Sequence, residues 1–230
     1  MNKNNCDLII PKQMRQIKPT RRSVSGIYAF KAETAIPFES TLERDFLIRK
    51  EFNVHVLDII PQPVQIPFVK NGRTYTYTPD FLVYYRLSNH SFEFYPKPQL
   101  IEVKPRAEIQ THWSEWKAKF RAARKISKEQ GWVFSVHDES RIRDQAFTNI
   151  RFLERYKRMQ FPVEESRAVI ETVKQMGLVP FHYLISRHFM GIYKAEGIAH
   201  LWYLLATRQL DCDINLPLSD FTELWTPTYE

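Results

Sequence analysis

The stretches TPDFLVYY (78–85) and LIEVKPR (100–106) decide the fold of this chain. Each is a short run of apolar, β-branched and aromatic residues, a pattern typical of a β-strand. Because side chains alternate across a strand, Glu102 and Lys104 point to the same face of the predicted sheet. If the strand that carries Asp80 pairs beside it, two carboxylates and an ammonium share one surface. Such a surface can hold a hard divalent cation against a phosphate and activate a water molecule.

The pattern alone has a plain alternative. A Pro-Asp pair followed at this distance by an acidic residue, any residue and a lysine arises by chance in roughly one chain in ten. In that interpretation Asp80 lies in a turn after Pro79, and Glu102 and Lys104 lie on a solvated sheet face. The neighbouring sequence has to separate the two interpretations.

The neighbouring sequence favours the interpretation as a catalytic site. PVQIPFVK (63–70) and RTYTYTPDFLVYY (73–85) are alternating or apolar runs joined at Asn71-Gly72, a strong hairpin signal. Further strands are predicted at 54–60 and 132–137. The predicted order is helix, strands, the Glu102 strand, helix and strand, which indicates a mixed α/β sheet flanked by helices, with the carboxylates near its centre.

A helix is predicted before the sheet, at PFESTLERDFLIRKEF (37–52), with a proline in its first turn. Its apolar residues recur every four positions, as in a stripe that faces a core: Phe38, Leu42 and Phe46. Glu39 and Glu43 are also four apart, so we expect them to repel each other on one helix face. Both could be solvated rim residues. We favour a functional role for Glu43 and leave Glu39 open.

The blocks FESTLERDF, FNVHVLDIIPQPVQI, YTPDFLV and LIEVKPR, in this order and spacing, resemble the catalytic domain of TnsA, the endonuclease subunit of heteromeric bacterial transposases. The resemblance covers about 38–137 and implies a restriction-endonuclease-like fold. By position it implies four catalytic residues: Glu43, Asp80, Glu102 and Lys104. With these we expect metal ligands at Glu43, Asp80, Glu102 and the backbone carbonyl of Val103.

The resemblance also implies cofactor and partners. Enzymes of this kind use Mg²⁺, or Mn²⁺ in its place, and cut the 5′ ends of double-stranded transposon DNA. A partner transposase (TnsB-like) cuts the 3′ ends, and an AAA+ ATPase (TnsC-like) regulates both. Two alternatives stay open: a restriction or repair nuclease of the same fold, and a non-catalytic DNA-binding module. The intact Asp80, Glu102 and Lys104 argue against the module.

The charge of the chain agrees with a polyanionic partner. The formal net charge is +7, and residues 1–31 hold seven basic residues and one acidic residue. In the predicted helix THWSEWKAKFRAARKISKEQG (111–131), the residues at core spacing are Trp113, Trp116, Phe120 and Ala123. Basic residues occupy the opposite side and, together with Arg106, are the candidate DNA-binding residues: Lys117, Arg121, Arg124, Lys125 and Lys128.

Several classes of protein are disfavoured. Cys6 and Cys212 have no paired spacing, which argues against a disulfide framework or a zinc knuckle. The sequence lacks a histidine metal motif, a signal peptide and an apolar run of membrane-spanning length. We therefore expect a bacterial cytoplasmic protein with no membrane partner.

The organisation expected is a basic N-terminal arm (1–37), a catalytic domain (38–150) and a C-terminal domain (151–230). Three helices are predicted after residue 162, followed by a stretch at 211–225 that could form a small β-wing, which suggests a winged-helix-like domain. Its expected core is apolar: Leu184, Ile185, Leu201, Leu204 and Leu205. Because 163–225 carries more acidic than basic residues, we expect it to contact protein first and DNA second.

Overall fold

Strands β6 (Phe81–Tyr85) and β7 (Gln99–Val103) pair antiparallel at the centre of a four-stranded sheet. β3 (Val56–Pro61) pairs antiparallel with the outer edge of β6, and β8 (Val133–His137) pairs parallel with β7, giving the order β3-β6-β7-β8. The pairing of Phe81 with Ile101 confirms that the strand after Asp80 lies beside the Glu102 strand. The sheet is mixed, as expected for a restriction-endonuclease-like fold.

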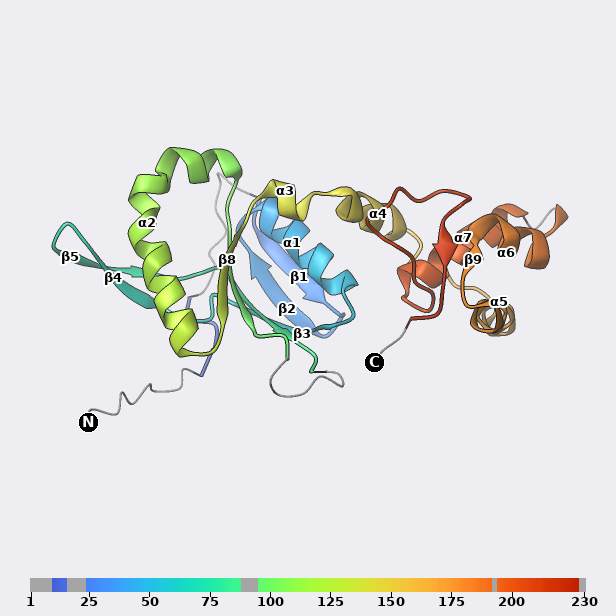
Figure 1. Ribbon diagram of the computed structural model, residues 1–230, viewed down its shortest axis with the longest axis horizontal. Helices are drawn as coiled ribbons and strands as arrows, with labels where there is room; N and C mark the ends of the chain where they lie inside the picture. The colour runs from blue at the N-terminus through green and yellow to red at the C-terminus, as the bar shows by residue number, and fades with distance from the viewer. Residues whose placement is uncertain (1–9, 16–23, 88–94, 192–193, 228–230) are drawn as a thin grey trace. The chain divides into compact units, whose positions relative to one another are not determined.

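This computed structural model describes four ranges of the chain: 10–15, 24–87, 95–191 and 194–227 (Figure 1). The chain divides into two compact units, Met1–Ile142 and Arg143–Glu230. The boundary lies earlier than the expected division at residue 150, because α4 (Gln145–Leu153) packs on α7 (Lys194–Ala206) of the second unit.

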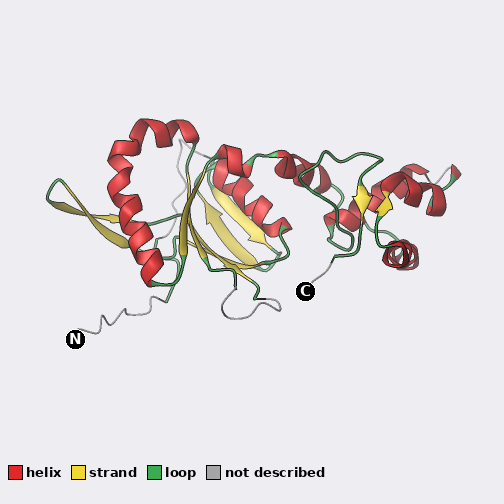
Figure 2. Ribbon diagram, in the orientation of Figure 1, coloured by secondary structure: helices red, strands yellow, loops and turns green. Residues whose placement is uncertain are grey.

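Two helices cover the two faces of the sheet in the first unit (Figure 2). α1 (Thr41–Phe52) packs on the face formed by odd-numbered residues such as Val83 and Ile101. α2 (Arg106–Glu129) packs on the opposite face, where Leu82 and Leu100 are buried against Phe120 and Ala123. Since Glu102 is even-numbered on the same strand as Leu100, its side chain points to the α2 face.

A β-hairpin supports each face. β4 (Ile66–Lys70) and β5 (Arg73–Tyr77) pair antiparallel beside α2. Their turn has positive φ at both Asn71 (51°) and Gly72 (74°), which confirms the predicted hairpin. β1 (Gly26–Phe30) and β2 (Thr34–Phe38) pair antiparallel, and their apolar residues join the core on the α1 side.

Two predictions for the N-terminal region are wrong. Residues 26–38 form the β1–β2 hairpin and are not part of a basic arm; the parts of the arm at 1–9 and 16–23 lie outside the described residues. The helix expected at 37–52 begins at Thr41, because Ser40 accepts a hydrogen bond from the backbone N–H of Glu43 and caps it. Pro37 is therefore a strand residue.

The second unit is mainly helical. Its helices are α4, α5 (Val163–Met176), α6 (Phe181–His188) and α7. The helix expected to end at Gly177 does so, with a φ of 81° there. All five residues predicted for the core of this unit are buried, at 5% exposure or less. A short antiparallel ladder joins β9 (Val179–Pro180) to β10 (Glu223–Leu224), so strand structure occurs near the end of the predicted wing segment.

Within the described residues, no helix is long and apolar enough to cross a membrane. α3 (Glu139–Ile142) completes the first unit.

Candidate active site

Asp80 lies immediately before β6, and its side chain is 13% exposed. Its Oδ2 accepts a hydrogen bond of 2.7 Å from the backbone N–H of Val103, which ties the start of β6 to the end of β7. The same oxygen lies 3.5 Å from Nζ of Lys104. Asp80 lies in the bend that follows Pro79, as the alternative interpretation expected, but a strand end and an ammonium hold its carboxylate there.

Lys104 follows β7 and joins the two carboxylates. Its Nζ lies 3.5 Å from Asp80 Oδ2, 3.7 Å from Glu102 Oε1 and 3.1 Å from the carbonyl of Val103. Its backbone N–H donates to the carbonyl of His137, so the ends of β7 and β8 fix its position. The structure thus brings together Asp80, Glu102 and Lys104, the carboxylate–lysine cluster.

The charge state of Lys104 follows from its neighbours. Burial by itself lowers the pKa of this ammonium, but the carboxylates of Asp80, Glu102 and Glu43 together outweigh burial and raise it. Lys104 therefore stays protonated across the physiological range. A permanent positive charge at this point can attract a phosphate oxygen or orient a water molecule.

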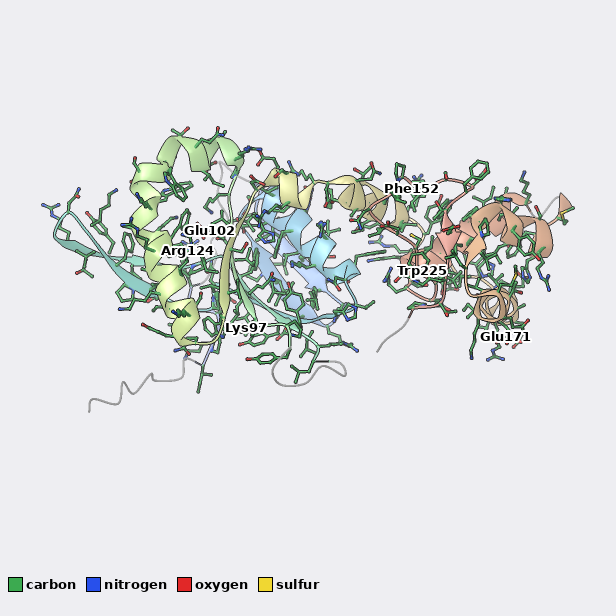
Figure 3. All side chains as sticks on the ribbon, in the orientation of Figure 1. Lys97, Glu102, Arg124, Phe152, Glu171 and Trp225 are labelled. Atoms are coloured by element: carbon green, nitrogen blue, oxygen red, sulfur yellow. The ribbon has the colours of Figure 1, made fainter. Side chains whose placement is uncertain are left out.

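Glu102, labelled in Figure 3, is buried at 1% exposure. Two side chains hold its carboxylate. Oε2 accepts a 2.6 Å hydrogen bond from the hydroxyl of Tyr77, and Oε1 accepts one of 3.1 Å from Nζ of Lys119. Burial, followed by the charge of Glu102, raises the pKa of Tyr77 well above its usual value, so the phenol remains a donor. Glu102 is thus anchored from β5 and from α2.

Tyr77 and Lys119 were not predicted from the sequence, although both leave a signal in it. α2 turns about 100° per residue, which places Lys119 on one flank of the buried stripe and Lys117 and Arg124 on the other. Lys119 is the basic residue of this helix that borders the aromatic side chains. Tyr77 alternates with exposed Thr76 and is 6% exposed, which marks it as an inward residue at the end of its strand.

Glu43 has a local structural role. Its carboxylate accepts hydrogen bonds from the backbone N–H of Glu39 (2.8 Å) and the hydroxyl of Ser40 (3.0 Å), a variant of the capping box at the start of α1. Burial is the main cause of the raised pKa of this carboxyl group. It lies close enough for its charge to raise the pKa values of Asp80 and Lys104. Glu43 therefore borders the cluster.

Glu39 lies outside the helix and has other partners. It precedes α1, so its carboxylate and that of Glu43 do not share a helix face as predicted, but the charge of Glu39 still contributes to the raised pKa of Glu43, as repulsion between them would. Its side chain forms an ion pair with Arg15, while its backbone N–H donates to Glu43. The carboxylate of Glu39 is thus engaged outside the cluster.

The carboxyl group of Asp80 lies among other charged groups. Burial, and then the charges of Glu102 and Glu43, raise the pKa of Asp80 well above its usual value, although Lys104 acts in the opposite direction. A bound divalent cation would stabilise the ionised carboxylate. Within the described residues, no three histidine, cysteine, aspartate or glutamate side chains converge as a metal-binding group. Mg²⁺ does not require one, because it commonly takes one or two carboxylates and completes its shell with substrate oxygens and water.

The predicted DNA-binding residues all lie on α2 and are exposed: Arg106, Lys117, Arg121, Arg124, Lys125 and Lys128. They do not contact the carboxylate–lysine cluster; the lysine of α2 that does so is Lys119. Of the predicted aromatic stripe, Phe120 is buried, whereas Trp113 is 44% exposed, so the stripe belongs to the core only in part. The ring of Trp113 lies 6.2 Å from that of Phe120, at the edge of the stripe.

Comparison with known proteins gives two family matches, one to each unit. Residues 53–139 match the family described as TnsA-like endonuclease N terminal, and residues 141–214 match TnsA endonuclease C terminal. The two matches meet beside the boundary between Ile142 and Arg143. No curated protein matches the chain. The fold, the carboxylate–lysine cluster and both matches together place the chain in the TnsA-like endonuclease family.

Proposed function

We propose that this protein is the metal-dependent endonuclease subunit of a heteromeric transposase and cuts the 5′ ends of the element. The observation that carries the proposal is the cluster itself: Nζ of Lys104 lies within 4 Å of carboxylate oxygens of both Asp80 and Glu102. The family supports an endonuclease of a transposition system. The metal dependence and the choice of strand are our inference.

The cluster suits Mg²⁺, for which Mn²⁺ can substitute. Asp80 is the leading ligand, because Oδ2 holds its hydrogen bonds and Oδ1 accepts none from the described residues. The carbonyl of Val103 and the carboxylates of Glu43 and Glu102 are the further candidates. A bound ion of this kind lowers the pKa of a coordinated water and polarises the phosphate.

The residues of the chain supply the remaining functions. Lys104 places an ammonium beside Asp80, where it can donate to a non-bridging phosphate oxygen as negative charge develops. Glu102 holds Lys104 in place and is itself fixed by Tyr77 and Lys119. Each polar group near the reacting phosphate is therefore oriented before DNA binds, which reduces the reorganisation that catalysis requires.

We infer the partners of the protein from its family and from the distribution of charged residues in the two units. We propose that the protein acts in the bacterial cytoplasm with a TnsB-like transposase and a TnsC-like AAA+ ATPase, on double-stranded transposon ends. The exposed cations of α2 suit the DNA backbone. The second unit, which carries more acidic than basic residues between 163 and 225, suits a protein partner better. We infer that its helices and short ladder act as a winged-helix-like docking domain.

The test is strand cleavage by the protein assembled with its partner transposase and ATPase on transposon-end DNA. Asp80→Ala should abolish 5′-end nicking in Mg²⁺, and Ca²⁺ should support DNA binding without cleavage, because its looser coordination positions the nucleophile poorly. Glu108→Ala, an exposed acidic residue in the first turn of α2, is the matched control and should cut at the wild-type rate. Wild-type nicking by Asp80→Ala would reject the active site.

A further inference from the structure

One face of the β4–β5 hairpin turns toward α2, and burial of that face falls from its base to its tip. The cross-strand pairs along it are Ile66–Tyr77, Phe68–Tyr75 and Lys70–Arg73. Ile66 and Tyr77 are buried, whereas Tyr75 is 45% exposed. α2 therefore covers the base of the hairpin and leaves the aromatic pair in its middle partly uncovered.

A cavity of about 270 Å³ lies at this place, lined by Phe68 and Tyr75 of the hairpin and by Trp116 of α2. The rings of Phe68 and Tyr75 stack with centroids 5.7 Å apart and an interplanar angle of 28°. The polar side chains of the lining are Lys70, Glu115 and Lys119. Aromatic rings thus form much of the lining, and these three side chains, with the phenol of Tyr75, offer hydrogen bonds.

The charges of the cavity disfavour a free anion as its ligand. Nζ of Lys70 lies 3.6 Å from Glu115, and Nζ of Lys119 lies 3.1 Å from Glu102, so a carboxylate already balances each lysine. A neutral, planar ligand with donors and acceptors on its edge fits better. Nucleobases have this chemistry: they stack on aromatic side chains and are recognised through their edges.

Lys119 connects the cavity to the active site. Nζ of Lys119 lies 4.5 Å from the centroid of the Trp116 ring in the cavity wall, and the same atom donates to Glu102 of the carboxylate–lysine cluster. A base in the cavity would therefore belong to a nucleotide close to the phosphate that is cut. The volume is at the small end of ligand pockets, which suits a single base.

We propose that this cavity is a subsite for one unpaired nucleobase of the substrate DNA beside the cleaved phosphate. The proposal rests on the endonuclease function proposed above. A base must leave the duplex stack to enter such a subsite, and it does so most easily where the duplex is mismatched, frayed or already nicked. The subsite would then hold the cut strand through stacking.

The experiment compares two fluorescein-labelled duplexes of the same sequence, one fully paired and one with a single bulged base, by anisotropy in Ca²⁺. The wild-type protein should bind the bulged duplex about tenfold more tightly, the gain expected from stacking one base on aromatic side chains. Tyr75→Ala and Trp116→Ala should remove this preference and leave affinity for the paired duplex unchanged. Trp113→Ala, an exposed tryptophan of α2 outside the cavity, is the matched control and should keep the preference.

The outcomes of this experiment support or overturn the nucleobase subsite. Equal affinity of the wild-type protein for the two duplexes overturns the subsite, and so does a preference that survives both Tyr75→Ala and Trp116→Ala. Tyr75→Phe, which keeps the ring, should retain the preference and guards against loss through misfolding. Metal-dependent nicking of paired DNA without a bulge preference rejects the subsite but leaves the endonuclease function standing. Failure to bind either duplex rejects the subsite, whereas the endonuclease function is decided by the cleavage assay of the assembled complex.

Discussion

The hydroxyl of Tyr77 donates a 2.6 Å hydrogen bond to Oε2 of Glu102 across the buried interface between the β4–β5 hairpin and the central sheet. A carboxylate that is 1% exposed needs such donors, because an ionised group that lacks partners in a protein interior is strongly destabilising. Tyr77 therefore supports the active-site charge from an element that is distant from Glu102 in the sequence.

Tyr77→Phe should lower the free energy of unfolding by about 1–3 kcal/mol, because it leaves a buried carboxylate with one donor fewer. Urea denaturation of the metal-free protein measures the change. Tyr75→Phe removes a half-exposed hydroxyl from the same strand and should change stability by no more than about 0.5 kcal/mol. Equal stabilities of Tyr77→Phe and the wild-type protein would mean that this bond does not contribute.

Lys119→Met should also destabilise the protein, by roughly 3 kcal/mol at most, because it removes one cation from the buried Glu102. The loss is limited because Nζ of Lys104 remains 3.7 Å away from the same oxygen. If the ion pair is the cause, adding Glu102→Gln should restore part of the stability, since the unbalanced charge disappears. Lys117→Met, on the other flank of α2, is the control; additive effects in the double variant would contradict the pairing.

The centre of the fold could be predicted because its signals are local and strong. Alternation in 81–85 and 99–103 sets which side chains share a face, and the pairing of Phe81 with Ile101 brings Asp80 to Val103 and Lys104. Asn71-Gly72 predicts its hairpin because asparagine and glycine readily adopt positive φ. These features depend on neighbours in the sequence or on one strand pairing.

The β1–β2 hairpin could not be predicted in this way. Its turn places Lys31 (φ 51°) and Ala32 (φ 58°) in the left-handed region, where residues other than glycine are disfavoured by roughly 1–2 kcal/mol each. No turn signal therefore marks the sequence, and burial of Phe30 and Ile36 against the sheet must stabilise the conformation. The periodicity of α2 places Lys119 beside the buried stripe, but that it pairs with Glu102 depends on how the helix packs on the sheet.

His137 should contribute stability that is lost as the pH is lowered from about 6.5 to about 4. Burial, and then the positive charges of Lys50, Arg141 and Arg49, lower the pKa of this imidazole from its usual 6.5 to about 4, with Asp138 opposing. In this window His137 is protonated in the unfolded chain but remains neutral in the folded chain. The stability that it contributes above pH 6.5 is therefore lost on acidification.

Unfolding free energies measured across this window should show a smaller decrease for His137→Phe than for the wild-type protein, by roughly 1–3 kcal/mol. His112→Gln replaces an exposed histidine of α2 and should follow the wild-type curve. Parallel curves for His137→Phe and the wild-type protein would contradict the assignment.

Reversal of Arg121, Arg124 and Lys125 to Glu should weaken DNA binding and flatten its salt dependence, by about 0.9 in the log–log slope for each phosphate that the protein no longer neutralises. These side chains are exposed, so the melting temperature should stay nearly unchanged. The matched control reverses three exposed cations of the second unit: Arg167, Lys174 and Arg187. A large drop in the melting temperature of the first variant would show that this face of α2 is structural. A larger loss of DNA affinity in the control variant would assign DNA contact to the second unit.

Truncation after Ile142 should give a folded nuclease unit, whereas truncation after Phe161 should give a poorly soluble one. The division between the units lies before α4, and the buried residues of α4 include Ile150 and Leu153, which belong to the second unit. A chain that ends at 161 keeps this helix but loses α7, on which it packs, so apolar side chains become exposed.

Truncation after Ile142 should also separate metal binding from assembly with the partner proteins. Residues 1–142 contain all the residues of the carboxylate–lysine cluster and should retain Mn²⁺ binding, measured by electron paramagnetic resonance, with Asp80→Ala in the truncated chain as the control. They should no longer co-purify with the partner ATPase or transposase, because the net-acidic second unit is the proposed docking domain. If residues 1–142 still assemble with both partners but lose affinity for transposon-end DNA, the second unit reads DNA, and its acidic balance does not prevent that role.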